Sequence, residues 1–578
     1  MKNWFWGLLS GMFLMVLLVI GAGILGWYLQ DQPPEISDNS LLELKLEGDI
    51  PEQVSPDITA QILEGVEPVT FIPLLREIEK AAADTKITGI LLKPSGLGLG
   101  WAKLQQLRRA LELFQSKGKR VVAWMGTGGA KEYYLASVAD RIYLSPVGVL
   151  DLKGMRAEVM FFKDGLEKIG VDAELERIGE YKNMADQFTE NRMTDAFREA
   201  TTAMLDSVYG NYLNGIGTAR KRPVDEMREL IEQSGPFEAE RALSAGLVDQ
   251  LLYEDELVEQ IGKEMKIEKE DKVSLGSYSK VSRESVGLDG KDRLAVIYAV
   301  GSITSGEDGI DPLSGKSMGS ETMISVLEEV MDDESIKGAV LRIDSPGGDA
   351  FASEDIWRAV MKLREKKPMV ISMSDVAASG GYLIAMTGDP VIAERTTLTG
   401  SIGIIYGKLN LKGLYDKLGI HKEIISRGKF ANLDSDYGPY TPEERNRVQA
   451  LMEDFYGKFI NKVAAARKMT PEDVDKVAQG RVWTGEQALE HGLVDELGGM
   501  ERSLEILKEK VGLPLDASVE LVEFPRHKSL MELIIERMQG NETGMPAAVS
   551  RWLLEGKFWE KLSINPYWAR IPYAVEFH

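Results

Sequence analysis

Two periods of hydrophobic and polar positions alternate along this chain, one typical of strands and the other of helices. Residues 339–343 and 368–372 are short, mostly apolar runs of the kind found in strands that are buried on both faces. Residues 354–366, between them, carry apolar side chains at helical spacing. Strand, helix and strand in this order predict a mostly parallel sheet covered by helices, which is the α/β fold class.

The pattern occurs twice. Identical residues recur 249 positions apart over a long stretch: Asp84 and Asp333, Gly89 and Gly338, Tyr133 and Tyr382, Ala136 and Ala385, Asp140 and Asp389, Gly170 and Gly419, Glu174 and Glu423, and Gly179 and Gly428. Further on the spacing becomes 246, because Gly-Leu-Val-Asp stands at both 246–249 and 492–495. This agreement indicates a tandem duplication with one net deletion of three residues.

Polar segments mark the boundaries between the copies and their flanks. The segment at 266–291 is charged and rich in Ser and Gly, as interdomain segments are. The apolar, helix-like stretches of the C-terminal tail have no counterpart in the first copy and could pack on their own domain, line a groove, meet another subunit or touch a membrane. We expect an anchor and linker at 1–39, a first copy at 40–265, a linker at 266–291, a second copy at 292–525 and an extension at 526–578.

The N-terminus carries an apolar segment at 4–29, and no charged residue lies between Asn3 and Gln30. About 20 such residues span a bilayer as a helix, whereas the apolar core of a cleaved signal peptide is about 7 to 15 residues long. Lys2 precedes the segment and Asp31 follows it. The positive-inside tendency therefore predicts a single-pass anchor with the rest of the chain outside the cytoplasm.

Composition removes several classes of function. The net charge of −23, from 68 Lys and Arg against 91 Asp and Glu, argues against a nucleic-acid partner. The chain contains no cysteine, so disulfides, thiolate metal sites and a cysteine nucleophile are all excluded.

The two copies differ at two positions that could carry chemistry. Ser379 of the second copy matches Ala130 of the first, and Lys182 of the first copy matches Ala431 of the second. A candidate nucleophile is kept in one copy and a candidate base in the other. This complementarity predicts one enzyme site assembled from both copies.

Ser379 lies where a strand-like run gives way to a helix start, a position that exposes a nucleophile near helix amides. The alternative is a helix N-cap serine, whose side chain satisfies the first amides of the helix. Gly380 and the turn at Gly347 and Gly348 could offer amides to an oxyanion. A phosphate-binding loop competes with this interpretation, but the GxxxxGK[ST] spacing is missing.

A serine nucleophile needs a base, and the chain has only four histidines: His421, His491, His527 and His578. In the repeat His421 matches Asp172 and His491 matches Ala245, so nothing supports a Ser-His-Asp triad, although it stays open. A lysine can serve when burial lowers its pKa and leaves it neutral. We expect Lys182 at such a position between the copies, the ordinary alternative being a surface lysine.

Four motifs together carry a family resemblance. They are AASGGY at 377–382, SPGG at 345–348, TGSIG at 399–403 and GEYKNMADQF at 179–188. Over about residues 40–525, and in the anchor, the chain resembles the long, duplicated form of bacterial signal peptide peptidase A (protease IV), peptidase family S49.

The resemblance implies a tandem duplication of a Clp protease/crotonase-like domain after a transmembrane helix, and a Ser-Lys dyad. On it, Ser379 is the nucleophile, Lys182 the general base and acid, and Ser401 orients the lysine. Gly380, Gly347 and Gly348 match the oxyanion region. No cofactor or metal is implied.

The resemblance also implies substrates, assembly and location. The substrates would be cleaved signal peptides and other hydrophobic peptides, and the assembly a homotetramer with enclosed sites. The protein would lie in the bacterial inner membrane with its catalytic domains on the periplasmic or extracytoplasmic side. Two rivals remain: a crotonase-like acyl-CoA enzyme, and an inactive membrane scaffold, which should lack half of the dyad.

Overall fold

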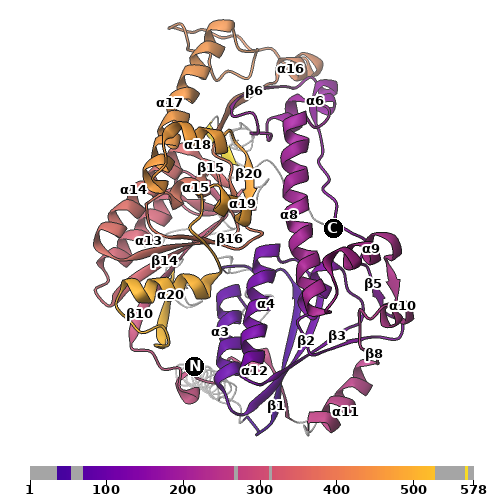
Figure 1. The fold of residues 1–578 in the computed structure, drawn as a ribbon. Helices are drawn as coiled ribbons and strands as arrows, with labels where there is room; N and C mark the ends of the chain where they lie inside the picture. Colours follow the sequence, from indigo (N-terminus) through magenta and orange to yellow (C-terminus); the bar gives the residue numbers. More distant parts are fainter. Residues whose placement is uncertain (1–35, 54–68, 266–270, 312–314, 527–566, 571–578) are drawn as a thin grey trace, which may run out of the picture.

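The computed structural model describes residues 36–53, 69–265, 271–311, 315–526 and 567–570 (Figure 1). The predicted anchor at 4–29 lies outside these ranges. Among the residues described, no helix combines the length and apolar character that crossing a membrane requires.

The first copy is built on a six-stranded sheet in which every pairing is parallel. In spatial order its strands are β8 (Gln250–Leu251), β4 (Arg141–Leu144), β3 (Arg120–Met125), β2 (Ile87–Leu97), β1 (Ser40–Gly48) and β9 (Lys272–Ser274). Strand β9 comes from the segment predicted to link the copies, which also contains α12 (Leu275–Tyr278) and the short helix η2 (Glu284–Val286).

The second copy repeats this arrangement in an eight-stranded sheet, in which only the edge strand β20 pairs antiparallel to its neighbour. In order the strands are β20 (Val482–Thr484), β18 (Leu398–Gly400), β16 (Met369–Ala378), β14 (Ile336–Ser345), β10 (Asp292–Val300) and β22 (Val519–Phe524), with β17 (Val391–Ala393) and β21 (Glu496–Leu497) beside β16. β2 and β14 begin 249 residues apart, as do β3 and β16. The predicted duplication of an α/β domain is therefore confirmed.

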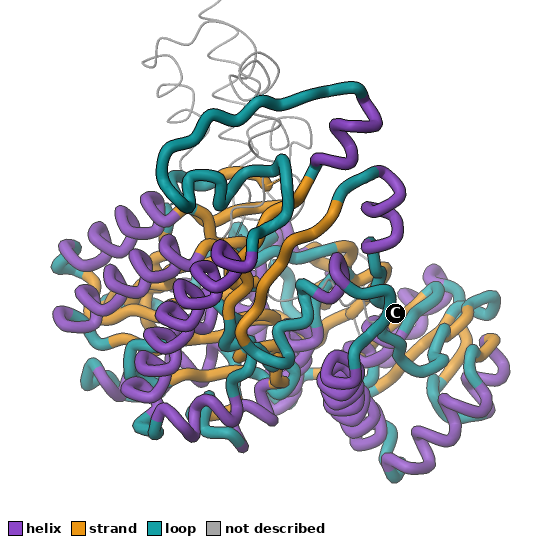
Figure 2. The backbone as a smooth tube through the Cα atoms, turned by 90° about the horizontal axis from the view of Figure 1, so that it is seen from above, coloured by secondary structure: helices purple, strands orange, loops and turns teal. Residues whose placement is uncertain are grey.

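Helices cover these sheets in both copies (Figures 1 and 2). Those of the first copy are α3 (Phe71–Ala83), α4 (Trp101–Ser116), α5 (Ala130–Ala136), α6 (Lys163–Ile169), α7 (Asp186–Thr189), α8 (Asp195–Ala219), α9 (Val224–Ser234), α10 (Ala239–Ser244) and α11 (Glu254–Met265). Those of the second copy are α13 (Ser320–Asp332), α14 (Ala350–Lys366), α15 (Gly380–Ala385), α16 (Lys412–Leu418), α17 (Pro442–Arg467), α18 (Pro471–Val477), α19 (Gly485–Glu490) and α20 (Met500–Lys510). The helix predicted at 354–366 is the body of α14.

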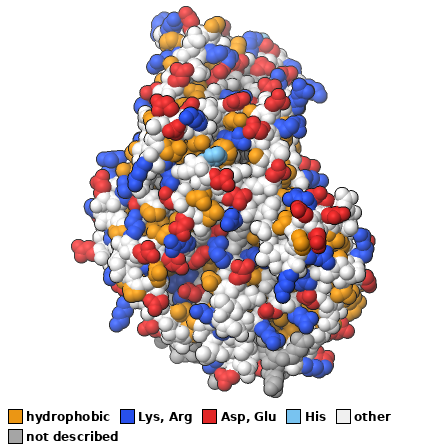
Figure 3. All heavy atoms as spheres, viewed as in Figure 1, with side chains coloured by type: hydrophobic (Ala, Val, Ile, Leu, Met, Phe, Trp, Pro, Cys, Tyr) orange, Lys and Arg blue, Asp and Glu red, His pale blue; other side chains and the backbone are white. Residues whose placement is uncertain are grey.

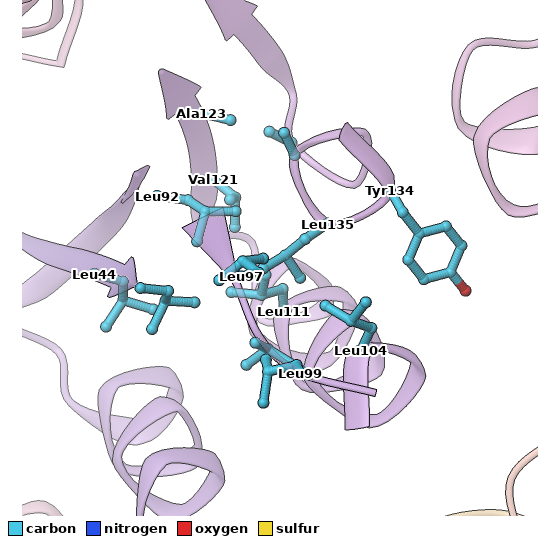
Figure 4. Close-up of a cluster of buried hydrophobic side chains, with 14 of the residues drawn as sticks. Leu44, Leu92, Leu97, Leu99, Leu104, Leu111, Val121, Ala123, Tyr134 and Leu135 are labelled. Carbon is cyan, nitrogen blue, oxygen red and sulfur yellow. The ribbon is translucent and has the colours of Figure 1, made fainter. Parts of the chain in front are cut away.

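The copies share a hydrophobic core. In the first copy, leucines of β1, β2 and α4 pack together with Val121 and Leu135 (Figure 4). The same cluster continues into the second copy, where it includes Leu294 and Val296 of β10. Their neighbours Ala295 and Ile297 belong to the second copy's own core, because successive strand residues point to opposite faces. One face of the second sheet is thus buried against the first copy.

A third sheet crosses from one copy to the other. In order its strands are β12 (Gly309–Asp311), β13 (Gly315–Gly319), β11 (Ser302–Thr304), β15 (Gly347–Asp349), β23 (Tyr567–Arg570), β19 (Ile404–Asn410) and β6 (Asp172–Ile178). Strand β6 belongs to the first copy and the other strands follow the linker. A separate two-stranded ribbon joins β5 (Val149–Leu150) to β7 (Phe237–Glu238).

The surface mixes both signs of charge. On the face shown in Figure 3, acidic and basic side chains are interspersed, with no large patch of basic residues.

Candidate active site

The pairing of β6 with β19 brings the two candidate residues together. The strands are antiparallel, in a register that runs from Ile404 opposite Ile178 to Asn410 opposite Asp172. Lys182 follows the end of β6 by four residues, and Ser401 precedes the start of β19 by three. The β6–β19 pairing between the copies therefore places Lys182 of the first copy near Ser379 and Ser401 of the second.

Lys182, Ser379 and Ser401 meet in a fully buried cluster, each with 0% of its surface exposed. Lys182 Nζ lies 2.7 Å from Ser379 Oγ, within hydrogen-bond distance. It also donates to the backbone oxygen of Ser401 at 2.9 Å and lies 3.0 Å from Ser401 Oγ. Three of the predicted residues thus form one connected group.

Burial sets the charge state of the lysine. It lowers the pKa of Lys182 from its ordinary 10.5 to about 7, because the charged ammonium loses its hydration inside the protein. Near pH 7 a large fraction of the amine is therefore neutral and can accept a proton. This is the desolvated position that the sequence predicted for a lysine base.

Ser379 adopts a strained backbone at the turn from β16 to α15. Its φ is 54° and its ψ is −115°, a region that residues other than glycine rarely occupy. Its N–H donates to the Gly400 carbonyl at 2.8 Å. Ser379 stands at the N-cap position, but its side chain forms no capping bond. The alternative of a purely structural N-cap is therefore wrong, since the hydroxyl lies against Lys182 instead.

The three glycines predicted at the oxyanion region lie close together. A Cβ on Gly380 would lie 3.3 Å from both Gly347 Cα and Gly348 N, and it would overlap Ser353 Oγ. The N–H of Gly347 already donates to Ser345 Oγ at 3.2 Å. Gly380 is the first residue of α15, where a backbone N–H has no partner within the helix. The N–H of Gly380 is therefore better placed than that of Gly347 to receive a negative oxygen.

Close backbone approach fixes the lysine loop. Gly480 of the second copy has a φ of 75°, and a Cβ there would lie 2.6 Å from Lys182 Cβ. The N–H of Tyr181 donates to the Gln479 carbonyl at 2.8 Å, again across the copies. Only glycine combines this positive φ with such proximity.

The corresponding place in the first copy lacks these groups. Ala130, the counterpart of Ser379, is the first residue of α5, whereas Ser379 directly precedes α15. Ala431 is the counterpart of Lys182. Two histidines lie apart from the cluster: His421 is exposed, and His491 packs against Trp483 with 4.1 Å between ring centroids. His527 and His578 fall outside the described residues. Within the described ranges, no group of three His, Cys, Asp or Glu side chains could hold a metal ion.

Two features of the site escaped the sequence analysis. Asn183, next to Lys182, is fully buried, and neither atom of its amide has a hydrogen-bond partner in the described structure. Strand β23 lies between β15 and β19, with Ala569 opposite Gly348 and Trp568 opposite Ile405. The motif GEYKNMADQF contains Asn183 as well as Lys182, whereas the short β23 lies in a tail that has no counterpart in the first copy.

Comparison with known proteins gives a consistent result. The family model "Peptidase family S49" matches twice, at residues 113–268 and 361–514. The chain is 35% identical over 518 residues to "Serine protease SPPA, chloroplastic" of Arabidopsis thaliana, which covers 88% of this chain and 75% of that protein. It is 31% identical over 499 residues to "Protease 4" of Salmonella typhi, which covers 84% and 78% respectively.

A shorter relative matches only part of the chain. A putative protease of Methanocaldococcus jannaschii is 34% identical over 247 residues, which are 42% of this chain and 78% of that protein. A match of about one copy's length agrees with the duplication seen in the fold.

Proposed function

Because this chain belongs to peptidase family S49 and is a serine-type peptidase, we propose that it cleaves peptide bonds with a dyad of Ser379 and Lys182. One observation carries this proposal: the buried amine of Lys182 lies 2.7 Å from the hydroxyl of Ser379. A lysine whose pKa is about 7 and a serine on a strained turn are suited to general-base and nucleophilic roles.

The chemistry is acyl transfer in two stages. Neutral Lys182 takes the proton of Ser379 Oγ as this oxygen attacks the carbonyl carbon of the substrate. The N–H of Gly380, with that of Gly348, stabilises the oxyanion. The Lys182 ammonium then protonates the leaving amine as the peptide bond breaks. In the second stage Lys182 takes a proton from water as the water oxygen attacks the ester carbonyl, and it returns this proton to Ser379 Oγ as the ester bond breaks and the acid product leaves.

Ser401 is assigned the role of orienting the lysine. Its backbone oxygen accepts from Nζ at 2.9 Å and its Oγ lies at 3.0 Å, so both hold the amine toward Ser379. Its own backbone has a φ of 53°, and its N–H donates to the Arg481 carbonyl at 2.7 Å. Losing Oγ alone leaves the backbone contact, so Ser401→Ala should lower kcat only by about tenfold or less.

We propose extended, hydrophobic peptides as substrates, including signal peptides already released from their proteins. The substrate class follows from the family resemblance. Strand β23 supports an extended conformation, because it shows that a segment can pair with β15 directly beside Gly348. An acyl-CoA substrate of the crotonase type is the rival, and the inactive scaffold is disfavoured because both dyad residues are present and in contact.

The proposed location is the bacterial inner membrane, with residues 4–29 as a single-pass anchor and the catalytic copies on the periplasmic or extracytoplasmic side. The proposal rests on the apolar N-terminal sequence and on the charges that flank it.

We propose that the chain associates with copies of itself into a closed assembly, which the family resemblance implies is a homotetramer. The proposal rests on a difference between the two copies in the order of one helix and one strand. Helices α6 and α16 correspond, 249 residues apart. In the first copy strand β6 comes after α6, whereas in the second copy strand β19 comes before α16. The counterparts of these strands are residues 155–161 and 421–427, and within the described structure neither segment pairs with a strand.

The unpaired segments are complementary in the same register. In the ladder between the copies Ile404 faces Ile178. Replacing each residue of this ladder by its counterpart 249 positions away in the other copy places Met155 opposite Arg427 and Phe161 opposite His421. Exposure alternates along 155–161 as it does in a strand, and Ile425 is 88% exposed. Residues 155–161 of one protomer would pair with residues 421–427 of the next, which repeats the internal ladder around a ring.

The dyad is tested by peptide hydrolysis with the full chain in detergent. Ser379→Ala and Lys182→Met should each lower kcat by at least about 1,000-fold on an apolar peptide. Lys429→Met is the matched control, because Lys429 is an exposed lysine in the corresponding loop of the second copy and should leave kcat unchanged. Wild-type turnover in either dyad variant would overturn the proposed function.

A further inference from the structure

A buried ion cluster joins the first copy to the catalytic turns of the second. Lys103 of α4 is almost fully buried, and its Nζ lies 3.1 Å from Asp344 Oδ2 and 3.6 Å from Asp375 Oδ2. Both carboxylates belong to the second copy, at the end of β14 and within β16. The first copy therefore supplies the cation that pairs with two acidic groups next to the site.

The cluster lies at an irregularity in the sheet. Ile343 of β14 pairs with Met373 of β16, but Ser345 pairs with Ala377. One residue of β14, Asp344, thus faces three residues of β16, which include Asp375. Asp344 Oδ1 closes this bulge by accepting from the N–H of Val376 at 3.1 Å. Bulges beside active sites re-aim the residues that follow them.

The residues that follow the bulge are those of the proposed mechanism. Asp375 precedes Ser379 by four positions, and Asp344 precedes Gly348 by four. Burial raises the pKa of Asp344 to about 6, and Lys103 acts against this rise. Without Lys103, two neighbouring carboxylates would remain in a largely buried place and repel each other.

The repeat shows that the arrangement is an exchange between the copies. In the second copy Asp349 caps α14, because its Oδ1 accepts from the N–H of Ala352 at 2.8 Å. In the first copy the matching residue is Gly100, and the matching N–H, that of Lys103, donates to Asp375 Oδ1 at 3.0 Å. The counterpart of Asp375 is Gly126. Helix α4 has no capping side chain of its own, and the second copy supplies the carboxylate.

The exchange is sterically exclusive. A Cβ on Gly100 would overlap the carboxylate of Asp375. The carboxylate therefore occupies the space in which the first copy would otherwise place its own capping side chain. The φ of Gly100 is −73° and its ψ is 168°, so the backbone itself would accept an aspartate.

We propose that Lys103 and the N-terminus of α4 act as a positioning device for the peptidase site, by holding Asp375 and Asp344 and thereby the turns that carry Ser379 and Gly348. This inference rests on the proposed function, because positioning is defined here by the nucleophile and the oxyanion donors.

Moving the capping carboxylate of α4 from Asp375 to position 100 separates an effect on the position of the site from an effect on the stability of the fold. Asp375→Ala removes both the cap of α4 and the link to β16, so it should lower the Tm and reduce kcat by about 10- to 100-fold with little change in KM. Gly100→Asp/Asp375→Ala gives α4 a cap of its own but leaves the link broken. We expect it to regain most of the lost Tm while kcat stays low.

The outcomes have distinct meanings. Recovery of kcat together with Tm in the double variant, or normal kcat in Asp375→Ala, would overturn the positioning role. Ser274→Ala is the matched control, since Ser274 caps α12, beside the edge strand β9 of the first copy, by accepting from the N–H of Ser277 at 3.2 Å, and its loss should lower Tm without changing kcat. Ser379→Ala, measured alongside, must be inactive; turnover there would overturn the proposed function, and the positioning role with it.

Discussion

Lys182 is kept largely neutral near pH 7 by its surroundings alone, because burial is the cause of its lowered pKa. No carboxylate is needed beside it, as one would be for a histidine in a triad. The hydrogen-bond partners that it has, Ser379 and Ser401, are uncharged. The amine therefore titrates near neutral pH, as the proposed role of general base requires.

Activity should rise with pH through about 7, because only neutral Lys182 can accept the proton of Ser379. The measurement is kcat/KM as a function of pH, whose acidic limb reports the free enzyme. An acidic limb with its midpoint far above 7, near the ordinary value of 10.5, would contradict a desolvated base.

The same burial has a cost in stability whose sign can be worked out. Between about pH 7 and 10.5 the unfolded chain binds a proton at Lys182 that the folded chain does not, so the free energy of unfolding rises with pH in this window. Lys182→Met should therefore unfold at a higher temperature than wild type at pH 7. The difference should narrow as the pH approaches 10.5, which thermal unfolding of both proteins can check.

Among the elements, β6 and β19 matter most, because their ladder is what places Lys182. Leu175 lies opposite Gly407 in the middle of this ladder. Leu175→Pro removes a backbone donor and should lower kcat by about 100-fold or more through a displaced lysine. Ile424→Pro is its counterpart in the second copy and should leave the dyad of an isolated chain intact. Comparable kcat in both variants would show that the ladder does not position Lys182.

Strand β23 occupies the edge at which an extended substrate would pair with β15. We therefore expect removal of residues 567–578 to lower KM for a peptide substrate, since no strand has to be displaced first. Steady-state kinetics of the truncated and full chains provide the measurement. A KM that stays the same or rises would show that substrates do not use this edge.

The sequence predicted the elements better than their partners. Apolar runs such as 339–343 became the buried β14, and the helical spacing at 354–366 became α14, because local periodicity reflects burial. The contact of Lys182 with Ser379 was expected from complementary losses in the repeat. The β6–β19 ladder was not, since nothing in a local pattern says which distant strand completes a sheet. The 249-residue register shows that Gly100 stands where the second copy has Asp349. Only the structure shows that Asp375 takes over the capping bond in the first copy.

At the scale of the whole molecule, the two similar domains meet in one buried cluster, because Lys182 of the first copy contacts Ser379 and Ser401 of the second. The pairing of β6 with β19 leaves their counterparts in the repeat, residues 155–161 and 421–427, without strand partners within the described structure. An exposed pair of complementary edges favours association between copies of the chain.

This association can be tested with cysteines, because the natural chain has none. In the proposed register Ala157 of one protomer faces Ile425 of the next, and facing strand residues lie within disulfide distance. Ala157→Cys/Ile425→Cys should therefore form dimers and larger linked species under oxidation, as seen on non-reducing gels. Ala157→Cys/Glu423→Cys, out of register by two residues, is the control. Equal linkage in both variants would contradict the register.

The shared core of the two copies has a consequence for how this enzyme could be divided. Leu294 and Val296 are buried in the first copy's cluster, so the halves are held by packing as well as by the chain between them. Two polypeptides that separate in the segment between α12 and β10 would each lack half of the dyad, yet each would present the surface that recruits the other. We expect two such fragments to be inactive apart and to regain peptidase activity when they are mixed.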